Sequence, residues 1–548
     1  MNRLKSLKLL NRDIYFWLPL LLMLAGLAVR AAGLGAVPGG VNQDEAMAAY
    51  DAYSLSLYGA DRLGMRMPVY FQAWGYAQMG ALMSYLMIPF IRLLGFGTVV
   101  IRLPTLLISA AGLWVTYLFV RDMLRREAGW AALFIAAINP WHIMQSRWAL
   151  EANMFPHFLL FAVYALYRSV YRNGAGPKIS VTVNLRPKCL SMFLFAMCMY
   201  TYGIAFYTVP LMLLVLAAVL LVKKQISRAE LLVCAAVYLL FAWPVFAVMA
   251  INYFRLPSLE TPFFTAAFFP AGQRMSDLLP FSQNVAAQFG SNLISLVNTV
   301  FLQKNDLPWN TIPRFGPLYI ISVPFAAIGA FWLLRRKSGK SHFLFVWLGA
   351  AVFSGLITNN VNVNRINIVF YPLIILCGIG LYALAAKIGA ILASGLVAAY
   401  VLLFAMFVQA YFGSYAGEIK RYFYADFLDC LSCAEQRDPD VYYISAATQS
   451  VSSPYVSEIL ALYALKTDPA YFRGDRPPNP AEHGLAYEAR FSYPAFSRVS
   501  AIPLAEAGLT SLYVVNIAEE MGRFPAGDYG EIYRSGRFCV LERISGGG

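Results

Sequence analysis

Charged residues are scarce in this sequence: only 13% of its 548 residues are Asp, Glu, Lys or Arg, whereas 59% are hydrophobic. An ordinary soluble domain carries about 25% charged residues. Too little polar surface is therefore left to coat a water-soluble particle of this length. The composition excludes a soluble enzyme, a disordered protein and a fibrous repeat, and no internal repeat or low-complexity segment is evident.

Cysteine is also sparse, with seven in the chain, and the cysteines do not form a disulfide scaffold. Four of them lie in apolar runs, as small core residues do. Cys430 and Cys433 form a C-x-x-C pair, but no thioredoxin-like βαβ pattern surrounds them. We therefore interpret this pair as structural and not redox-active.

Long hydrophobic runs are what the sequence has in abundance, and they predict an all-α polytopic membrane protein. In lipid the backbone must satisfy its own hydrogen bonds, which leaves helices or closed barrels. Runs of 20 or more residues exclude the short alternating strands of a barrel. We expect about eleven transmembrane helices, at 14–34, 99–120, 128–141, 153–171, 189–203, 204–222, 229–250, 317–334, 342–358, 366–385 and 389–411.

Basic residues set the expected orientation. Six Lys/Arg clusters fall at alternate ends of the eleven runs, and all six are cytoplasmic if the N-terminus is cytoplasmic. The formal charge of +14 is thus attributed to a plasma-membrane protein and not to nucleic-acid binding. Counting 76–96 as a span would reverse this pattern, so we predict an amphipathic helix on the outer surface there. A genuine span that violates the rule locally remains the alternative.

Two domains are expected from this topology. Residues 1–412 form the membrane domain, with a long first external loop at 35–98. Residues 413–548 form an extracytoplasmic mixed α/β domain, with helices at 419–431 and 456–465, strands at 441–445 and 511–516, and a hairpin at 529–541. This tail holds 12 Lys/Arg and 17 Asp/Glu, while the rest of the chain holds 31 and 12.

Two adjacent acids, Asp44 and Glu45, open a predicted short helix at 44–57, directly after a Gly/Pro-rich turn. Asp44 is well placed to act as the helix N-cap. The alternative is a general base at the membrane–water boundary, where reduced solvation makes a carboxylate pKa tunable. The residues alone leave both interpretations open.

Arginines in short external segments need an explanation, because positive charge is disfavoured there. Arg102, Arg147 and Arg365 lie at such positions. Each alone is compatible with snorkelling to lipid headgroups, but as a set they favour binding of a phosphate, which the guanidinium fork holds bidentately.

His142 and Glu151 are further polar candidates in the second external loop. Asp44 and Glu151 could together bind a divalent cation through oxygen ligands. Two acids are too few to argue for a metal site, and we expect no metal or other cofactor.

Several short motifs in order along the chain resemble those of the GT-C-fold glycosyltransferases that use lipid-linked sugars. The group most similar is that of the protein mannosyltransferases and aminoarabinose transferases. The motifs are P-G-G-V-N-Q-D-E at 38–45, Y-G-A-D-R-L-G-M-R-M-P at 58–68, R-L-P at 102–104, N-P-W-H-I-M-Q-S-R at 139–147, P-R-F-G-P-L-Y-I-I-S-V-P at 313–324 and N-R-I-N-I-V-F-Y-P-L at 364–373.

The resemblance, which covers most of residues 14–411, implies that Asp44 is the catalytic carboxylate of the first loop. Arg102 then matches an arginine of that group's second span, and Glu151 stands where metal-dependent oligosaccharyl relatives carry an acidic motif. The Lys-Pro that aminoarabinose transferases carry late in the first loop has no clear counterpart, and Arg66 with Met67-Pro68 is the nearest.

We therefore predict an inverting glycosyltransferase that moves a sugar from a polyprenyl-phosphate donor to an extracytoplasmic acceptor, which is a protein, lipid or glycan. Asp44 is the expected base, assisted by Glu45. The expected phosphate ligands are Arg102, Arg147 and Arg365, with Arg66, His142 and Glu151 lining the site. A flippase for lipids or polyprenol-linked sugars is the alternative, although no transporter-like repeats are seen; a scaffolding membrane protein is a third possibility.

Overall fold

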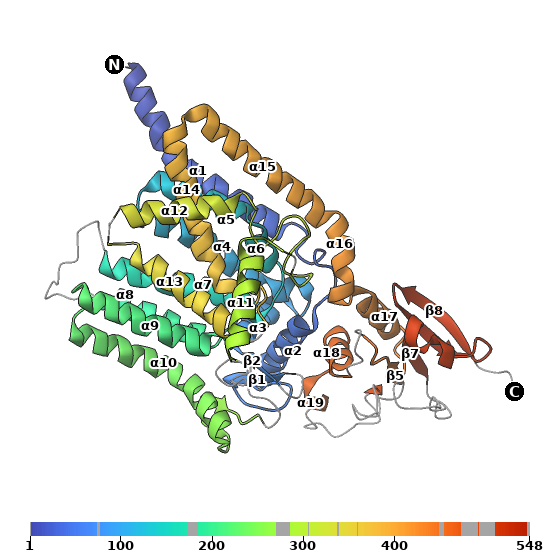
Figure 1. The fold of residues 1–548 in the computed structure, drawn as a ribbon. Helices are drawn as coiled ribbons and strands as arrows, with labels where there is room; N and C mark the ends of the chain where they lie inside the picture. The colour runs from blue at the N-terminus through green and yellow to red at the C-terminus, as the bar shows by residue number, and fades with distance from the viewer. Residues whose placement is uncertain are drawn as a thin grey trace.

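The computed structural model describes residues 2–73, 77–171, 185–269, 285–304, 306–336, 339–358, 360–448, 454–472, 491–492 and 510–544. A bundle of long helices makes up most of the molecule, and a smaller part with a β-sheet lies at one end of it (Figure 1). The predicted all-α bundle with a mixed C-terminal part is thereby confirmed in outline. Tyr76, the first residue of the helix predicted at 76–96, lies outside the described residues.

Each of the eleven apolar runs forms a helix. These are α1 (Asn2–Ala31), α4 (Thr98–Met123), α5 (Arg126–Ile138), α7 (Glu151–Val170), α8 (Arg186–Cys198), α9 (Ala205–Val222), α10 (Arg228–Phe254), α12 (Ser322–Arg335), α13 (His342–Ile357), α14 (Phe370–Ile388) and α15 (Ala390–Phe412). Among the described residues, five helices are long and apolar enough to cross a membrane, and shorter apolar helices accompany them. The count of eleven spans stays a prediction.

Helix α14 lies in the middle of the bundle, packed against α12 and α5. Its contact with α12 is close because two glycines face each other's backbone. A Cβ on Gly329 would meet the carbonyl of Leu376, and one on Gly380 would meet the carbonyl of Phe325. Small residues permit such close approach in membranes, where packing and not the hydrophobic effect holds helices together.

The segment predicted to be the first external loop folds into α2 (Gln43–Tyr58), the hairpin of β1 (Tyr70–Ala73) and β2 (Ala77–Gly80), and α3 (Leu82–Leu94). Helix α3 has 13 residues, so it is about 20 Å long, well short of the roughly 30 Å hydrocarbon core. A surface position for this apolar segment fits that length. The predicted helix at 76–96 therefore begins later than expected, because β2 occupies its first residues.

The segment between α10 and α12 was not assigned from the sequence. It contains β3 (Leu259–Glu260), β4 (Thr265–Ala266) and α11 (Val285–Val300), and α11 packs against α13. Strand β4 also joins the first loop, since Thr265 N donates to Met67 O at 3.2 Å and Val69 N donates to Thr265 O at 3.0 Å.

The C-terminal part has a five-stranded sheet in the order β6-β5-β7-β9-β8, in which β5 pairs parallel to β6 and β7 while β9 pairs antiparallel to β7 and β8. Cys430 and Cys433 lie on α17 as free thiols. Helix α18 packs against α2 and ties this part to the first loop. The elements are α16 (Ser414–Ile419), η5 (Lys420–Phe423), α17 (Ala425–Glu435), β5 (Val441–Ile444), α18 (Pro454–Ala464), α19 (Pro469–Phe472), β6 (Phe491–Ser492), β7 (Ser511–Asn516), α22 (Ile517–Glu520), η7 (Met521–Arg523), β8 (Tyr529–Ser535) and β9 (Phe538–Arg543).

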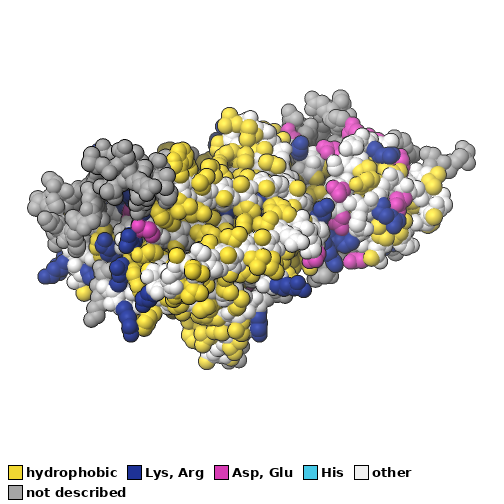
Figure 2. Space-filling view, turned by 90° about the horizontal axis from the view of Figure 1, so that it is seen from above, with side chains coloured by type: hydrophobic (Ala, Val, Ile, Leu, Met, Phe, Trp, Pro, Cys, Tyr) yellow, Lys and Arg dark blue, Asp and Glu magenta, His cyan; other side chains and the backbone are white. Residues whose placement is uncertain are grey.

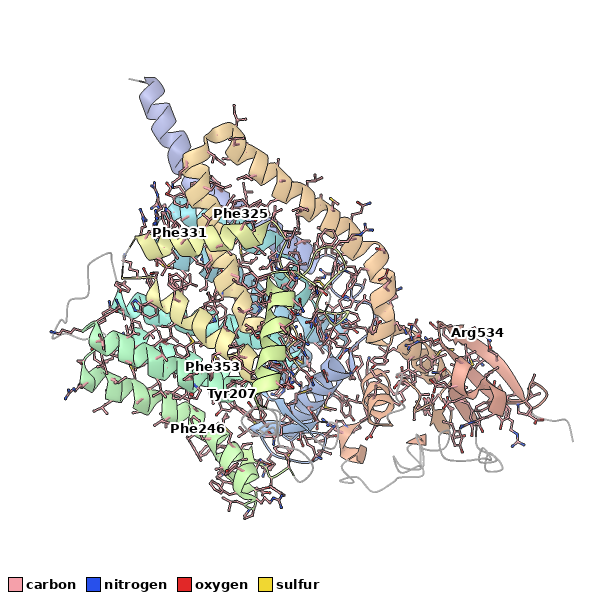
Figure 3. The ribbon with its side chains drawn as sticks, in the orientation of Figure 1. Tyr207, Phe246, Phe325, Phe331, Phe353 and Arg534 are labelled. Atoms are coloured by element: carbon pink, nitrogen blue, oxygen red, sulfur yellow. The ribbon has the colours of Figure 1, made fainter. Side chains whose placement is uncertain are left out.

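Side-chain charge differs between the two ends of the molecule (Figure 2). The bundle surface is largely hydrophobic, and Lys and Arg gather at its end away from the C-terminal part. Acidic and basic residues are mixed on the C-terminal part itself. Phe246 on α10 belongs to the bundle, and Arg534 on β8 belongs to the sheet at the other end of the molecule (Figure 3). This distribution agrees with the expected topology, and the orientation itself stays a prediction.

Candidate functional site

The two adjacent acids of the first loop point to different environments. Asn42 is the N-cap of α2, and its side-chain oxygen accepts a hydrogen bond from Asp44 N at 3.1 Å. Asp44 thus lies in the first turn and is not the N-cap that the sequence suggested. Its side chain is half-buried, whereas Glu45 is fully buried. The positive end of the helix dipole favours a carboxylate at Asp44.

Glu45 forms a buried, bidentate ion pair with Arg102. Arg102 Nε donates to Oε1 and Nη2 donates to Oε2, both at 2.8 Å. Ala149 N donates a further bond to Glu45 Oε1 at 2.9 Å. Both side chains are 0% exposed. Both oxygens of the Glu45 carboxylate are thus held by protein donors, and its expected catalytic role stays a prediction.

Arg102 uses its remaining donors on the Gly/Pro-rich turn before α2. Nη1 donates to Leu34 O at 2.9 Å and to Pro38 O at 2.8 Å, and Nη2 donates to Gly40 O at 2.8 Å. All five guanidinium N–H groups are then engaged. In this structure none is left for a phosphate, and the expected donor-phosphate contact of Arg102 stays a prediction.

Arg147 closes the carboxyl end of α1. Its Nη1 donates to Val29 O at 2.8 Å and Arg30 O at 2.7 Å, and its Nη2 donates to Ala32 O at 2.6 Å and Gly33 O at 3.0 Å. A cation at a helix C-terminus satisfies carbonyls that the helix leaves unpaired. Arg147 is 0% exposed, and its expected contact with the phosphate stays a prediction.

Arg147 is further enclosed by the end of α15. Tyr411 Oη accepts from its Nε at 3.2 Å, and the guanidinium lies 5.4 Å from the Tyr411 ring centroid and 5.0 Å from that of Phe412. Burial lowers the pKa of Arg147 from its ordinary value, an effect that the Tyr411 hydroxyl opposes. Aromatic faces and carbonyl oxygens thus replace water around this charge.

His142 lies in a buried hydrogen-bond chain that the sequence did not reveal. Arg30 donates to its Nδ1 from Nε at 3.2 Å, and its Nε2 lies 2.9 Å from Tyr371 Oη. Tyr371 Oη lies 2.7 Å from His157 Nδ1. Burial, followed by the charge of Arg30, lowers the pKa of His142 well below its usual range. A neutral ring that accepts at Nδ1 must donate from Nε2 to Tyr371.

Burial also changes the interpretation of His142, which is only 1% exposed. It lies in the interior of this structure, and its expected place in the lining of the site stays a prediction. Arg30 could have been noticed, because it is an arginine at the outer end of the first run, where positive charge is disfavoured.

Glu151 begins α7 and accepts a hydrogen bond from Gly80 N. It is 3% exposed, so it links β2 to the bundle and does not line an open surface. Among the described residues, no group of three or more His, Cys, Asp and Glu side chains is arranged to hold a metal ion.

Arg365 and Arg66 are the two predicted basic residues that are not enclosed. Arg365 is half-buried in the turn before α14. Its backbone N–H donates to Asn362 O at 3.0 Å and to Asn362 Oδ1 at 3.1 Å. Asp306 Oδ2 supports the same turn by accepting from Val363 N at 2.7 Å. Arg66 is exposed, and its carbonyl accepts from Thr265 Oγ1 at 2.7 Å.

A pocket of about 210 Å³ with polar and apolar lining lies beside η5, which contacts the start of α2. Asn42 Nδ2 donates to Tyr422 O at 3.3 Å, and Val41 N donates to Phe423 O at 2.7 Å. The lining includes Asp306, which also holds the Arg365 turn. We call this the outer pocket, and its residues are Asp306, Pro308, Thr311, Pro313, Tyr415, Glu418, Ile419 and Tyr422.

Among solved structures, the chain is similar to ArnT from Cupriavidus metallidurans bound to undecaprenyl phosphate. That likeness covers 96% of this chain and 98% of ArnT, with 14% identity and a TM-score of 0.60. The chain has the GT-C fold. The fold inferred from the short motifs is therefore confirmed.

Two further structures share the GT-C fold with this chain. ArnT in the apo state matches with a TM-score of 0.57 at 14% identity, over 96% of this chain and 98% of that one. The oligosaccharyltransferase AglB from Archaeoglobus fulgidus, in complex with an inhibitory peptide and a dolichol-phosphate, matches with a TM-score of 0.51 at 13% identity. This match covers 82% of the present chain and 64% of AglB. No family model and no curated protein matches the sequence.

Proposed function

We propose that the protein is a membrane glycosyltransferase that transfers a sugar from a polyprenyl phosphate to an extracytoplasmic acceptor with inversion. The observation that carries this proposal is the division of labour in the first turn of α2. Glu45 is neutralised by Arg102, while the adjacent Asp44 remains at the partly exposed helix start. On a GT-C fold, that arrangement is suited to Asp44 as the single base, with the Glu45–Arg102 pair fixing the helix turn that carries it.

Asp44 takes the proton from the acceptor hydroxyl in this mechanism. The acceptor oxygen attacks the anomeric carbon, and the bond between that carbon and the phosphate oxygen breaks. Its electron pair leaves with the polyprenyl phosphate, and the anomeric configuration inverts. A carboxylate in the first turn of α2 interacts favourably with the helix dipole, and the ionised carboxylate is the form that accepts the proton.

We assign the stabilisation of the departing phosphate to Arg365, and Arg66 remains a second candidate. Arg365 is half-buried and lies in a turn that Asp306 holds from the outer pocket. A preorganised guanidinium stabilises developing negative charge without reorganising. Glu45 and Arg102 are positioning residues in this proposal, because their buried pair fixes the start of α2. Arg147 and His142 are buried positioning residues too, and they hold the end of α1.

The lipid nature of the donor is proposed by analogy with the two relatives. ArnT was solved with undecaprenyl phosphate and AglB with a dolichol-phosphate. The identity of the sugar and acceptor is left open, so the assay uses a panel of polyprenyl-phosphate sugars and a membrane extract as acceptor.

The test measures release of free polyprenyl phosphate by the purified full-length protein in vesicles. Asp44→Asn should reduce release by about 10²–10⁴-fold, the usual contribution of a general base, with unchanged expression. Asp528→Asn, an exposed acid far along the chain, should match wild type. Normal release by Asp44→Asn would remove Asp44 from the mechanism, and donor movement across the vesicle without release would indicate a transporter.

A further inference from the structure

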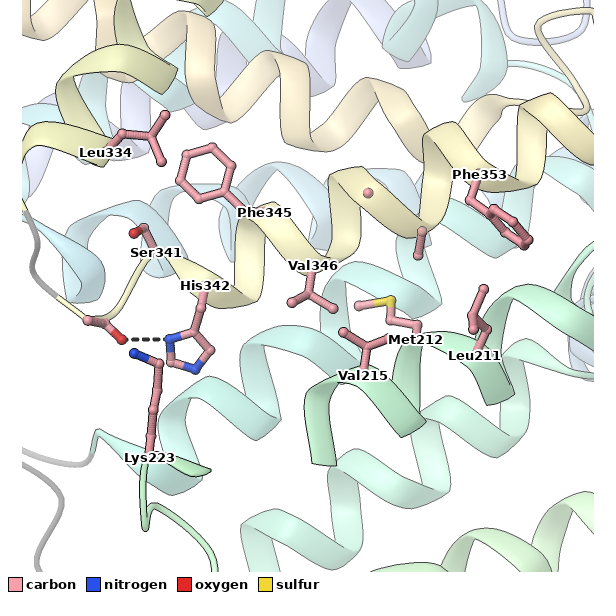
Figure 4. A pocket seen from close by; sticks show the side chains of 13 residues that line it. Leu211, Met212, Val215, Lys223, Leu334, Ser341, His342, Phe345, Val346 and Phe353 are labelled. Atoms are coloured by element: carbon pink, nitrogen blue, oxygen red, sulfur yellow. Dashed lines mark hydrogen bonds between the residues drawn. The ribbon is translucent and has the colours of Figure 1, made fainter. Parts of the chain in front are cut away.

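A groove of about 800 Å³ runs between α9 and α13, outside the site described above (Figure 4). Its walls are almost entirely apolar side chains, and Gly349 leaves open space on the α13 side. The lining residues are Leu211, Met212, Val215, Lys223, Leu334, Gly339, Ser341, His342, Phe345, Val346, Gly349, Ala350 and Phe353. We call this the α9–α13 groove.

One end of the groove is polar and basic. Lys223 follows the last residue of α9 with an exposed side chain, and its ammonium lies beside the ring of His342 in Figure 4. Lys340 adds a second cation nearby, 5.6 Å from the Tyr171 ring. A cationic opening to an apolar groove complements a molecule with a negative head and a hydrocarbon tail.

His342 adds a second feature that indicates a ligand. Its Nδ1 lies 2.6 Å from Gly339 O, and because a carbonyl only accepts, Nδ1 must carry the proton. In the neutral ring Nε2 is then an acceptor. This atom is buried and has no hydrogen-bond partner among the described residues. A hydroxyl group delivered to the groove would satisfy it.

The basic end of the groove lies far from Asp44. Helix α9 starts next to the first loop, since a Cβ on Gly80 of β2 would touch the carbonyl of Thr201. The helix has 18 residues, so Lys223 is about 27 Å further along the bundle. A donor lipid with its phosphate at Asp44 would not place that phosphate at Lys223.

We propose that the α9–α13 groove binds a glycerophospholipid with an anionic, hydroxyl-bearing head group from the leaflet at that end. One acyl chain lies between α9 and α13, the phosphate meets Lys223, and a head-group hydroxyl donates to His342 Nε2. Basic pockets between helices commonly select anionic lipids in this way. The site is independent of the proposed transfer reaction.

The experiment uses full-length protein reconstituted in vesicles of phosphatidylcholine with a minor fraction of phosphatidylglycerol. After extraction in mild detergent, native mass spectrometry counts the retained lipids. Wild type should retain phosphatidylglycerol in preference to phosphatidylcholine. Lys223→Gln should lower that preference about fivefold, the effect of one lysine at a lipid surface. Gly349→Leu should fill the groove and release the lipid.

Matched controls are available in the same chain. Lys387→Gln removes an exposed lysine at the end of α14, and Gly395→Leu places a leucine in open space on α15; both should retain lipid as wild type does. His342→Ala should lower the retention of phosphatidylglycerol. Retention of phosphatidic acid, which lacks the head-group hydroxyl, should stay unchanged. Equal retention of phosphatidylglycerol and phosphatidylcholine by wild type would overturn the proposal. Unchanged retention of phosphatidylglycerol by Lys223→Gln and Gly349→Leu would overturn it too. The proposal would also be overturned if Gly349→Leu lost an added polyprenyl phosphate and still retained phosphatidylglycerol.

Discussion

The carboxylate of Glu45 and the guanidinium of Arg102 face each other in a bidentate pair from which solvent is excluded. The partners come from α2 and α4, so the pair fixes the start of α2 against the bundle. The same guanidinium holds three carbonyls of the preceding turn. The position of Asp44 therefore depends on an ion pair made by its neighbour.

Removing the charge of Glu45 should destabilise the protein far more than removing that of Asp44. Glu45→Gln leaves the Arg102 charge buried without its counter-ion, which typically costs about 3–5 kcal/mol. Asp44→Asn, one residue earlier at a partly exposed position, should change stability by about 0.5 kcal/mol or less. Thermal unfolding in detergent checks both. Equal midpoints for the two variants would show that the pair does not hold α2.

The cap of α2 should matter for activity as well as for stability. Asn42→Ala removes the oxygen that accepts from Asp44 N and the amide that donates to Tyr422 O, and should cost about 1 kcal/mol. Ser227→Ala removes a comparable cap from α10, far from α2. We expect similar losses of stability, with slower sugar transfer only for Asn42→Ala. If both variants transfer sugar equally well, the cap does not position the base.

A side chain at Gly112 should disrupt the His142–Tyr371–His157 chain. A Cβ there would overlap Tyr371 Oη and press on His157 Nδ1, so Gly112→Ala should cost about 1–3 kcal/mol. Gly395→Ala, in open space on α15, is the control. Adding Tyr371→Phe removes the overlapping hydroxyl, so the double variant should lose less stability than the sum of the singles. Strict additivity in this cycle would contradict the contact.

The buried acid Asp61 should make stability depend on pH. Burial and, next, the charge of Asp51 raise the pKa of Asp61 from 3.8 to about 7. Its Oδ1 accepts from Leu63 N and Met65 N, while Oδ2 is buried without a partner among the described residues. The folded state thus holds a proton that the unfolded state releases. Stability should fall as pH rises from about 4 to about 7, by about 1.4 kcal/mol for each unit of pKa difference.

Asp61→Asn imitates the protonated acid and should flatten this pH dependence. Thermal midpoints measured across that pH range are the readout. Asp528→Asn, at an exposed position, should keep the wild-type profile. A fall in stability that persists unchanged in Asp61→Asn would assign the pH dependence to another group.

The helices and the GT-C fold could be predicted because apolar runs and ordered motifs are local in the sequence. All eleven runs became helices, and the break between α8 and α9 fell at the expected position. Helix α11 was missed, because a polar-faced helix of 16 residues has no long apolar run to reveal it. Strand β2 was missed because its residues merge with the apolar stretch of α3.

The roles of the arginines could not be read from the sequence, because they depend on carbonyl oxygens. A phosphate and a helix C-terminus both present oxygen acceptors to a guanidinium, and local sequence does not distinguish them. Arg102 and Arg147 contact turns and helix ends more than 60 residues away in the chain. Arg365 has a half-buried side chain, and both its position on the outer side and its role stay proposals.

Arg147 caps the carboxyl end of α1, although it lies outside that helix. The carboxyl end of α1 is synthesised more than 100 residues before the guanidinium that covers its carbonyls. These oxygens receive their guanidinium hydrogen bonds only once residue 147 has been made, which is after α4 and α5 have been synthesised. A chain truncated before residue 147 would therefore lack the guanidinium that satisfies the carboxyl end of α1.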